Sequence, residues 1–337
     1  MMIHIMKLIT CASYYCTGSS AVTDFVSEFS NVHSLTDEEF RFVQDPEGIS
    51  DLEFNLVENY HRHNSGHALK RYKRLVDFYS GNAILKRYES FFHGNWKKCS
   101  YEYINQLTDF SYKGWWQYDL IDRGKFFYFR KRIINKILHL LIWRNNPDRQ
   151  LNTMKNEITL VSHPTEDYFL QCTRDYIEKL FSSVSNGKDI VMVDQIVPPT
   201  NLKRYLRYFN NLKVVVVDRD PRDIFVLEKY VYKDGVIPNE VNTFCKWFKT
   251  TRAHRKADNL ETENITFIQF EDMIYKYEQV KQKLIEFLDL DPQKHTKQRQ
   301  IFNPDVSIKN TRTWEKYKCD PKEIKVIERE LPNYLYF

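Results

Sequence analysis

Glycine and closely spaced cysteines are both scarce in this chain. Only 9 of its 337 residues are glycine, and it contains no internal repeat or low-complexity tract. The six cysteines show neither CxxC spacing nor another metal-binding pattern, and a chain of this size does not need disulfides to fold. These absences argue against a disulfide-stapled secreted protein and a cysteine-based metal site. They predict a cytoplasmic protein that requires no metal.

Long hydrophobic runs are also missing. The first ten residues form an apolar run that is too short and too interrupted for a signal peptide and lacks a small-residue cleavage site. The longest other run, at 137–143, is far below the length that spans a bilayer, and the basic residues 130–132 precede it. We expect a buried amphipathic helix there, with peripheral contact to a membrane surface as the alternative.

The net charge is only slightly positive. A formal charge of +5 suits a polyanionic ligand, but it falls short of the clustered excess that nucleic-acid-binding proteins carry, so no nucleic acid is expected as a partner. Hydrophobic residues make up 42% of the chain, which is enough for a sizeable core. We expect residues 1–337 to form one domain, and the oligomeric state stays open.

Five short apolar runs alternate with helical patterns. The run at 212–217, LKVVVV, is apolar on both faces, as buried parallel strands are. Amphipathic patterns predict helices at 20–30 and after residue 270. Strands separated by helices imply a three-layer α/β fold with a central parallel sheet. The predicted strands lie at 3–10, 40–44, 189–193, 212–217 and 265–270.

Residues 50–180 interrupt this alternation. The stretch is rich in aromatic residues, and it has helical periodicity and no proline between Pro46 and Pro147. It predicts a large helical insertion between the second and third strands of the sheet.

A turn of small residues joins the first predicted strand to the first predicted helix. The sequence from 10 to 20 reads TCASYYCTGSS, and no lysine follows Gly18, so the turn is not a Walker A motif. Backbone N–H groups at a helix N-terminus are unpaired, and the helix dipole there favours an anion. The turn therefore predicts a phosphate or sulfate site at the carboxyl edge of the sheet, on the same edge as Asp45, Asp194 and Arg219.

The valine-rich strand leads directly into the sequence RDPRD at 219–223. Arg219 stands at the tip of a buried strand, and its guanidinium can hold a phosphate through two hydrogen bonds. The alternative is an Arg–Asp network that caps the next helix, with Asp220 or Asp223 near its N-terminus. Both roles are compatible.

These motifs follow one another in a particular order along the chain. After the turn and RDPRD come IQFEDM at 268–273, which opens a helix that closes with FLDL at 287–290, and the basic stretch KNTRTW at 309–314. In this order the chain resembles the sulfotransferases that use 3′-phosphoadenosine 5′-phosphosulfate (PAPS). The resemblance covers about residues 3–30 and 188–320 and leaves the insertion unmatched. It implies a P-loop-like fold and sulfuryl transfer from PAPS to a hydroxyl, with 3′-phosphoadenosine 5′-phosphate (PAP) as product and no metal.

The resemblance also implies which residues bind the nucleotide. Arg219 would hold the 3′-phosphate, and Lys309 and Arg312 would close over the nucleotide. The turn that would hold the 5′-phosphosulfate consists of Tyr15, Cys16, Thr17, Gly18, Ser19 and Ser20.

Three positions depart from the family pattern. Cys16 stands where a lysine is common, and Leu227 stands where a serine follows the arginine by eight residues. Asp194 and Gln195 stand where many members have Thr-His after a lysine. The 3′-phosphate therefore needs another partner than a serine, and backbone N–H groups of the turn must stabilise charge without the lysine.

Four residues are candidates for the general base that takes the proton of the acceptor hydroxyl. Asp194 and Asp45 each end a predicted strand on the same edge of the sheet. His61 and His63, in the sequence YHRHN, open the insertion and titrate near neutral pH. For each of the four, a helix cap, a turn or a solvated side chain is the alternative role.

The residues of the insertion are the basis for predicting the acceptor. Between His61 and Lys98 there are nine Lys or Arg residues against two acidic ones, interleaved with aromatic residues. Aromatic faces and basic side chains together suit sugars, so the favoured acceptor is a hydroxyl of a glycan or glycolipid, as for a bacterial-type carbohydrate sulfotransferase. A sterol or other lipid alcohol is the alternative. The aromatic cluster at 112–118 is expected to pack at least partly inside the insertion.

Two other functions fit parts of the sequence. A P-loop kinase-like enzyme would need the Walker lysine and the Mg²⁺-binding serine or threonine, and both are missing. A catalytically degenerate protein that only binds a nucleotide or glycan is compatible with Cys16, Leu227 and Gln195.

The first prediction is a preference for PAP over AMP, because Arg219 and the basic residues at 309–312 would bind the additional phosphate. Calorimetry with both nucleotides measures it, and equal affinities would contradict it.

The substitution Arg219→Ala is expected to weaken PAP binding by about 2–4 kcal/mol, the range for losing a charge-assisted pair in a desolvated site.

Overall fold

The structure is a computed structural model that describes residues 6–81, 87–151, 154–253 and 261–337. The first three residues of the strand expected at 3–10 lie outside these ranges, as do short parts of the predicted insertion at 82–86 and 152–153.

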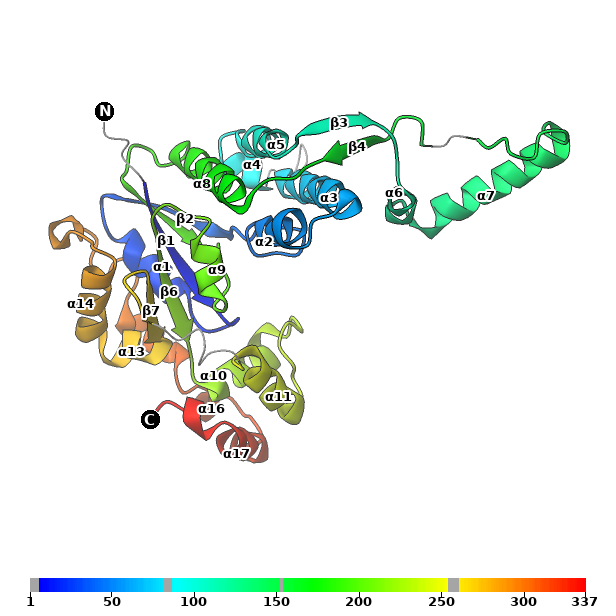
Figure 1. The fold of residues 1–337 in the computed structure, drawn as a ribbon. Helices are drawn as coiled ribbons and strands as arrows, with labels where there is room; N and C mark the ends of the chain where they lie inside the picture. The colour runs from blue at the N-terminus through cyan, green and yellow to red at the C-terminus, as the bar shows by residue number, and fades with distance from the viewer. Residues whose placement is uncertain (1–5, 82–86, 152–153, 254–260) are drawn as a thin grey trace.

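Five parallel strands form the central sheet, in the order β2-β5-β1-β6-β7 (Figure 1). Strand β1 pairs with β5 on one side and with β6 on the other. The chain thus runs to opposite sides of β1 in its two halves, and such a reversal point is where ligands bind in open α/β sheets. The strands are β1 (Lys7–Ser13), β2 (Val32–Glu39), β5 (Ile190–Asp194), β6 (Leu212–Asp218) and β7 (Ile265–Gln269).

Helices cover both faces of this sheet, which confirms the predicted three-layer α/β fold (Figure 1). On one face, α1 (Ser20–Ser27), α13 (Phe270–Tyr275) and α14 (Tyr277–Phe287) share a core with Val215 and Val217 of β6. On the other face, Val214 and Val216 belong to a core with α3 (Arg62–Ser80), α5 (Trp96–Gln106) and α8 (Glu166–Ser182). Because alternate residues of a strand face opposite sides, this double burial explains the run of four valines.

The remaining helices include several short ones. Within the insertion they are α2 (Ile49–Glu53), α4 (Arg87–Phe91), α6 (Gln117–Asp122) and α7 (Gly124–Leu141). Farther along the chain they are α9 (Leu202–Leu206), α10 (Pro221–Val226), α11 (Val241–Thr251), α15 (Pro304–Ser307), α16 (Thr313–Lys316) and α17 (Pro321–Glu330). Among the described residues, no helix combines the length and hydropathy that crossing a bilayer requires.

The strand predicted at 40–44 is wrong. The second strand of the sheet is β2, and residues 41–45 form a turn and bend after it. Phe40 and Phe42 are fully buried because they pack against Tyr88, and the N–H of Arg41 donates to the Tyr88 hydroxyl at 2.9 Å. The apolar pattern therefore reflects burial in a turn, while β2 itself lies at an edge of the sheet and reads as the polar sequence VHSLTDEE.

The insertion contains an element that its periodicity does not predict. The strands β3 (Phe110–Lys113) and β4 (Ile158–Val161) pair antiparallel between the helices. They lead into an arm in which α6 lies beside α3, where Lys70 pairs with Asp119 at 2.7 Å, and α7 extends away from the body of the molecule (Figure 1).

The expectation of a buried helix at 137–143 is also wrong. No residue of α7 is buried, and the side chains of Ile137, Leu140 and Leu141 are 47%, 58% and 73% exposed. The physical reason is the arm, which carries α7 beyond the reach of the helices that form the core (Figure 1).

Close packing of α3 on β4 depends on Gly66. A Cβ atom at this position would lie 2.0 Å from the backbone carbonyl oxygen of Leu160, an atom that cannot move without shifting the strand. We expect Gly66→Ala to lower the free energy of unfolding by about 3 kcal/mol, measured by chemical denaturation. Lys73→Ala, at an exposed position of the same helix, is the control and is expected to change it by less than about 0.5 kcal/mol.

Candidate functional site

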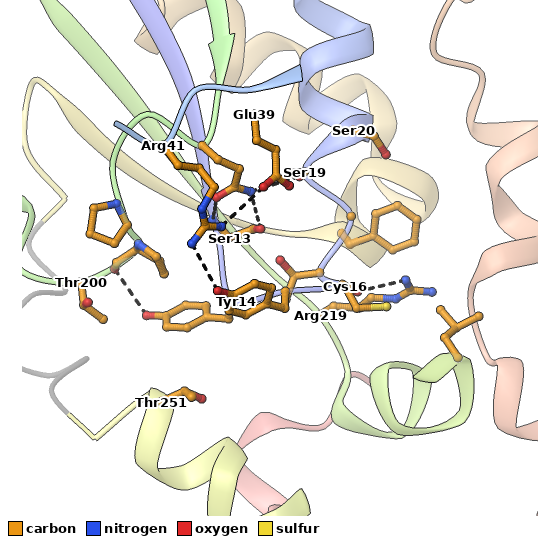
Figure 2. A pocket seen from close by; sticks show the side chains of 18 of the residues that line it. Ser13, Tyr14, Cys16, Ser19, Ser20, Glu39, Arg41, Thr200, Arg219 and Thr251 are labelled. Atoms are coloured by element: carbon orange, nitrogen blue, oxygen red, sulfur yellow. Dashed lines mark hydrogen bonds and ion pairs between the residues drawn. The ribbon is translucent and has the colours of Figure 1, made fainter. Parts of the chain in front are cut away.

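A cavity of about 550 Å³ opens at the carboxyl edge of the sheet. Its walls come from the turn after β1, the ends of β2, β5 and β6, and the first residue of α13 (Figure 2). The turn at 15–20 and Arg219 both line this cavity, so the structure brings together the two features that the family resemblance assigns to one nucleotide.

The turn has an unusual backbone conformation. Tyr15 and Cys16 have φ angles of 70° and 54°, a region that non-glycine residues rarely adopt and that concentrates at functional sites. Gly18 has φ of 85°, and a Cβ atom there would lie 2.4 Å from the ring of Phe270. Glycine is therefore required at this position both by conformation and by close packing.

Several polar groups of the turn have no partner. Within the described part of the chain, no hydrogen bond involves the backbone N–H groups of Thr17, Gly18 and Ser19. The hydroxyl of Thr17 is buried and also lacks a partner there. Helix α1 begins at Ser20, so these donors stand at the positive end of its dipole. An anion placed here would accept hydrogen bonds from these donors.

Gln195 fixes the position of this turn. Its side-chain amide donates to the Ser13 hydroxyl at 2.5 Å and to the Ser19 hydroxyl at 3.5 Å, while its amide oxygen accepts from the Ser13 N–H at 3.3 Å. Gln195 has φ of 57°, which turns the chain after β5 toward the cavity. An amide cannot act as a base at neutral pH, so Gln195 positions the turn rather than moving a proton.

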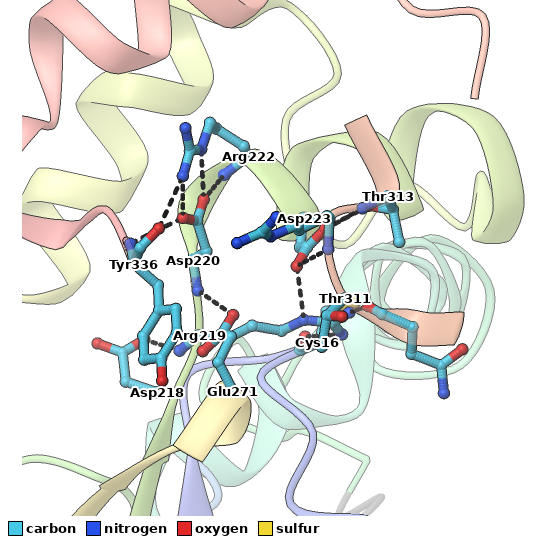
Figure 3. Close-up of polar contacts among 12 residues, drawn as sticks. Cys16, Asp218, Arg219, Asp220, Arg222, Asp223, Glu271, Thr311, Thr313 and Tyr336 are labelled. Carbon is cyan, nitrogen blue, oxygen red and sulfur yellow. Dashed lines mark hydrogen bonds and ion pairs between the residues drawn. The ribbon is translucent and has the colours of Figure 1, made fainter. Parts of the chain in front are cut away.

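Arg219 joins the turn to the C-terminal part of the chain. Its guanidinium donates to the carbonyl oxygen of Cys16 at 3.3 Å (Figure 3) and to the carbonyl oxygen of Asn310. It also lies 4.6 Å from the ring of Phe270. Its Nε makes no hydrogen bond within the described residues and lies 3.9 Å from a carboxylate oxygen of Asp223. Because Nε is buried, a phosphate in the cavity would instead use the second N–H of Nη1 or Nη2.

The aspartates of RDPRD have structural roles. Asp220 caps α10 by accepting from the N–H of Arg222 at 2.8 Å, and it pairs with the Arg222 guanidinium at 2.7 Å (Figure 3). Asp223 accepts from the N–H of Thr313 at 2.6 Å. The capping network considered for this motif is thus present, and it leaves Arg219 as the residue of the motif that lines the cavity.

Lys309 and Arg312 lie near the cavity without lining it. Both side chains are exposed, and the Arg312 guanidinium lies 5.9 Å from the ring of Tyr275. Between them, Asn310 lines the cavity and its carbonyl accepts from Arg219. That Lys309 and Arg312 close over a bound nucleotide stays a prediction.

Asp194 and Asp45 are neighbours of residues that line the cavity, Gln195 and Arg41. Burial, together with the nearby carboxylate of Glu39, raises the pKa of Asp194 to about 7. Asp45 accepts from Nε of Arg41 at 2.9 Å and from the Tyr79 hydroxyl, so it holds Arg41 in place. Neither carboxylate lines the cavity.

His61 and His63 lie elsewhere in the structure. The ring of His61 caps α3 by accepting from the N–H of His63 at 3.3 Å. His63 lines a second cavity, of about 540 Å³, and packs edge-on against Trp116 at 4.1 Å between ring centroids. The structure therefore brings none of the four candidate bases into the wall of the cavity that holds the turn, and a catalytic role for them stays a prediction.

Two charged residues that line the cavity, Glu39 and Arg41, are absent from the sequence-based candidates. Glu39, whose side chain is 53% exposed, lies 3.4 Å from the Arg41 guanidinium, and both face the turn (Figure 2). Arg41 also donates to the Tyr15 hydroxyl at 3.3 Å. Although burial opposes it, hydrogen bonds to Asp45 and Tyr15 raise the pKa of Arg41, so it stays charged. The sequence EEFRF places both charged residues at the carboxyl end of β2. The strand predicted at 40–44 puts Arg41 inside a strand instead, so neither residue is predicted as a site residue.

Metal ligands do not gather anywhere in the described ranges. No group of three or more His, Cys, Asp or Glu side chains is placed there to hold a metal ion.

Known proteins resemble this chain only loosely. No family model matches it, and no curated protein does. The sulfotransferase domain of the Synechococcus PCC 7002 olefin synthase is 11% identical, with a TM-score of 0.39 over 96% of this chain and 86% of that one. Sulfotransferase STF9 from Mycobacterium avium is 10% identical, with a TM-score of 0.40 over 99% and 78%. Retinol dehydratase, solved with androsterone and the inactive cofactor PAP, is 12% identical, with a TM-score of 0.36 over 97% and 80%. Superpositions this loose do not identify the ligand or the reaction of this chain.

The raised pKa of Asp194 predicts a pH dependence of stability. The folded state holds this proton up to about pH 7, whereas the unfolded state releases it near pH 4, so the wild type loses stability as the pH rises between these values. We expect Asp194→Asn to remove this loss. The variant should therefore gain on the order of 1–3 kcal/mol relative to wild type between pH 4 and pH 8 in denaturant titrations.

The control is Asp305→Asn, because the Asp305 side chain is 81% exposed. Its stability difference from wild type is expected to stay constant over the same pH range. A constant difference for Asp194→Asn would show that this carboxyl is not desolvated in the folded protein.

Proposed function

We propose that this protein is a PAPS-dependent sulfotransferase that transfers a sulfuryl group to a hydroxyl of a glycan or glycolipid. One observation carries the proposal: a single cavity is lined both by a turn with unpaired N–H groups at a helix N-terminus and by Arg219. PAPS has two separate anionic ends, and these two features match them. Bound PAPS would supply the sulfuryl group.

Arg41 is our candidate for the charge that Cys16 does not provide. Burial raises the pKa of the Cys16 thiol to about 11, so it is neutral and neither attracts nor repels an anion at neutral pH. The Arg41 guanidinium lines the same cavity and donates to the hydroxyl of Tyr15, the residue before Cys16. A cation at this place would stabilise negative charge on the leaving phosphate together with the N–H groups of the turn.

Tyr232 is our candidate for the second partner of the 3′-phosphate. Leu227 lines the cavity but has no hydrogen-bonding side chain. The side chain of Tyr232 lines the cavity as well, is 56% exposed and offers a hydroxyl donor.

Glu39 is our candidate for the general base. Its carboxylate lies at the end of β2, lines the cavity and is open to solvent, so an acceptor hydroxyl could reach it. Arg41 would orient it from 3.4 Å. Asp194, by contrast, does not line the cavity, and its Oδ1 is buried, so an acceptor hydroxyl in the cavity would not reach it.

The second cavity supports a sugar as acceptor. In its wall the Arg62 guanidinium lies 4.0 Å from the Trp116 ring, and Arg71 lies 5.4 Å from the Tyr118 ring. Two buried polar groups in residues of this wall, the Trp116 indole N–H and the Thr159 hydroxyl, have no hydrogen-bond partner among the described residues. Ring faces, cations and free donors together suit a glycan that is longer than one sugar.

The test is transfer of labelled sulfate from PAPS to a panel of glycans, glycolipids and lipid alcohols. We expect Glu39→Gln to lower kcat by about 10²–10⁴-fold, because it removes the base, while PAP affinity changes little. Glu38→Gln is the matched control, since this neighbouring carboxylate does not line the cavity. Unchanged turnover in Glu39→Gln would exclude Glu39 as the base, and absence of both PAP binding and transfer would refute the proposed function.

A further inference from the structure

Helix α7 presents a continuous apolar stripe to solvent. Five side chains recur at positions i, i+3, i+7, i+11 and i+14, which places them on one face of the helix. Isolated exposed apolar residues are normal, but a stripe along a whole helix marks an interaction surface. Its members and their exposed fractions are Phe126 (81%), Phe129 (55%), Ile133 (58%), Ile137 (47%) and Leu140 (58%).

The rest of the arm contacts the other side of α7. The side-chain oxygen of Asn135 accepts from the N–H of Leu151 at 2.7 Å, and Lys131 lies 4.6 Å from the ring of Trp115. At 100° per residue, Asn135 and Lys131 are on the side of the helix opposite Ile133. The arm therefore holds α7 so that the stripe faces outward, at the far end from the body of the protein (Figure 1).

The same segment is strongly basic. Residues 123–147 contain no Asp or Glu. Lys136 and Arg132 are on one flank of the stripe and Arg130 is on the other, by the helical spacing. The basic residues of the segment are Arg123, Lys125, Arg130, Lys131, Arg132, Lys136 and Arg144.

The basic residues beside the stripe indicate which kind of partner binds it. A second copy of the helix packed on the same face would bring two sets of flanking cations together, which is unfavourable. An apolar stripe between basic flanks instead matches a lipid surface, where the acyl region accepts the apolar side chains and anionic headgroups pair with Lys and Arg.

We propose that α7 docks this protein on an anionic membrane surface and lies in the plane of the interface. Helix α7 spans 18 residues and carries charged residues along its length, so it rests on the bilayer and does not cross it. The arm of β3, β4 and α6 places the body of the protein to one side of the surface (Figure 1). This docking does not depend on the chemistry in the cavity.

The experiment is co-sedimentation of the full-length protein with phosphatidylcholine vesicles that contain or lack phosphatidylserine. We expect binding only when phosphatidylserine is present, and we expect it to weaken as the salt concentration rises. Arg132→Gln combined with Lys136→Gln should lower the partition coefficient by about fivefold for each charge removed.

A stripe variant tests the apolar contribution. Phe129→Ser, Ile133→Ser and Ile137→Ser together should lower vesicle binding by about 100-fold or more. The matched control is Val236→Ser with Val306→Ser, two exposed apolar residues outside the arm, 53% and 56% exposed, and it should bind as the wild type does.

Three outcomes would overturn the proposal. They are equal binding to neutral and anionic vesicles, no binding of the wild type to either, and unchanged binding of the stripe variant. A concentration-dependent dimer of the wild type that binds no vesicles and that the stripe variant abolishes would assign the stripe to a second copy of the chain instead. The lipid dependence of the wild type needs no variant, so the proposal stays testable even if a triple substitution perturbs folding.

Discussion

The buried guanidinium of Arg219 is the interaction on which the architecture of the cavity depends. It follows the last residue of strand β6, and it donates to the carbonyl oxygens of Cys16 and Asn310, which come from opposite ends of the chain. Because the peptide group is planar, a hydrogen bond to the Cys16 carbonyl oxygen also fixes the direction of the N–H group of Thr17. Arg219 thereby couples the shape of the anion-binding turn to the position of the C-terminal segment.

Because of this coupling, a bound ligand and the protein carbonyl groups would both use N–H groups of Arg219. Nη1 and Nη2 each donate one N–H to a protein carbonyl, which leaves a second N–H on each for a ligand, while Nε is buried 3.9 Å from the Asp223 carboxylate. The neighbouring aspartates reinforce the arrangement, because Asp223 binds the N–H of Thr313 and thus fixes the segment that carries Asn310. A phosphate arriving at Arg219 would find a preoriented donor and a preformed wall, which lowers the entropic cost of binding.

The insertion divides the molecule into regions with different physical demands. Near the sheet its helices build an aromatic core in which Tyr88, Trp96 and Phe92 are fully buried. Beyond β3 and β4 the arm has almost no core, and its apolar side chains stay exposed on α7. An exposed apolar stripe lowers the solubility of a protein unless a partner covers it. The arm and the cavity are therefore best regarded as two separate interaction sites on one chain.

The sequence by itself determined the three later strands of the sheet and the turn of small residues after β1, because runs such as VVVV at 214–217 must be buried on both faces and small-residue turns have local backbone chemistry. It also determined that Arg219 stands at the tip of a strand. Only the tertiary structure decided that Glu39 and Arg41 line the cavity, because β2 is a polar edge strand and Phe40 and Phe42 owe their burial to aromatic residues some 50 positions away, such as Tyr88. Likewise, an amphipathic pattern at 126–140 requires one face to meet something apolar, but whether that partner lies inside the protein depends on where the arm carries the helix.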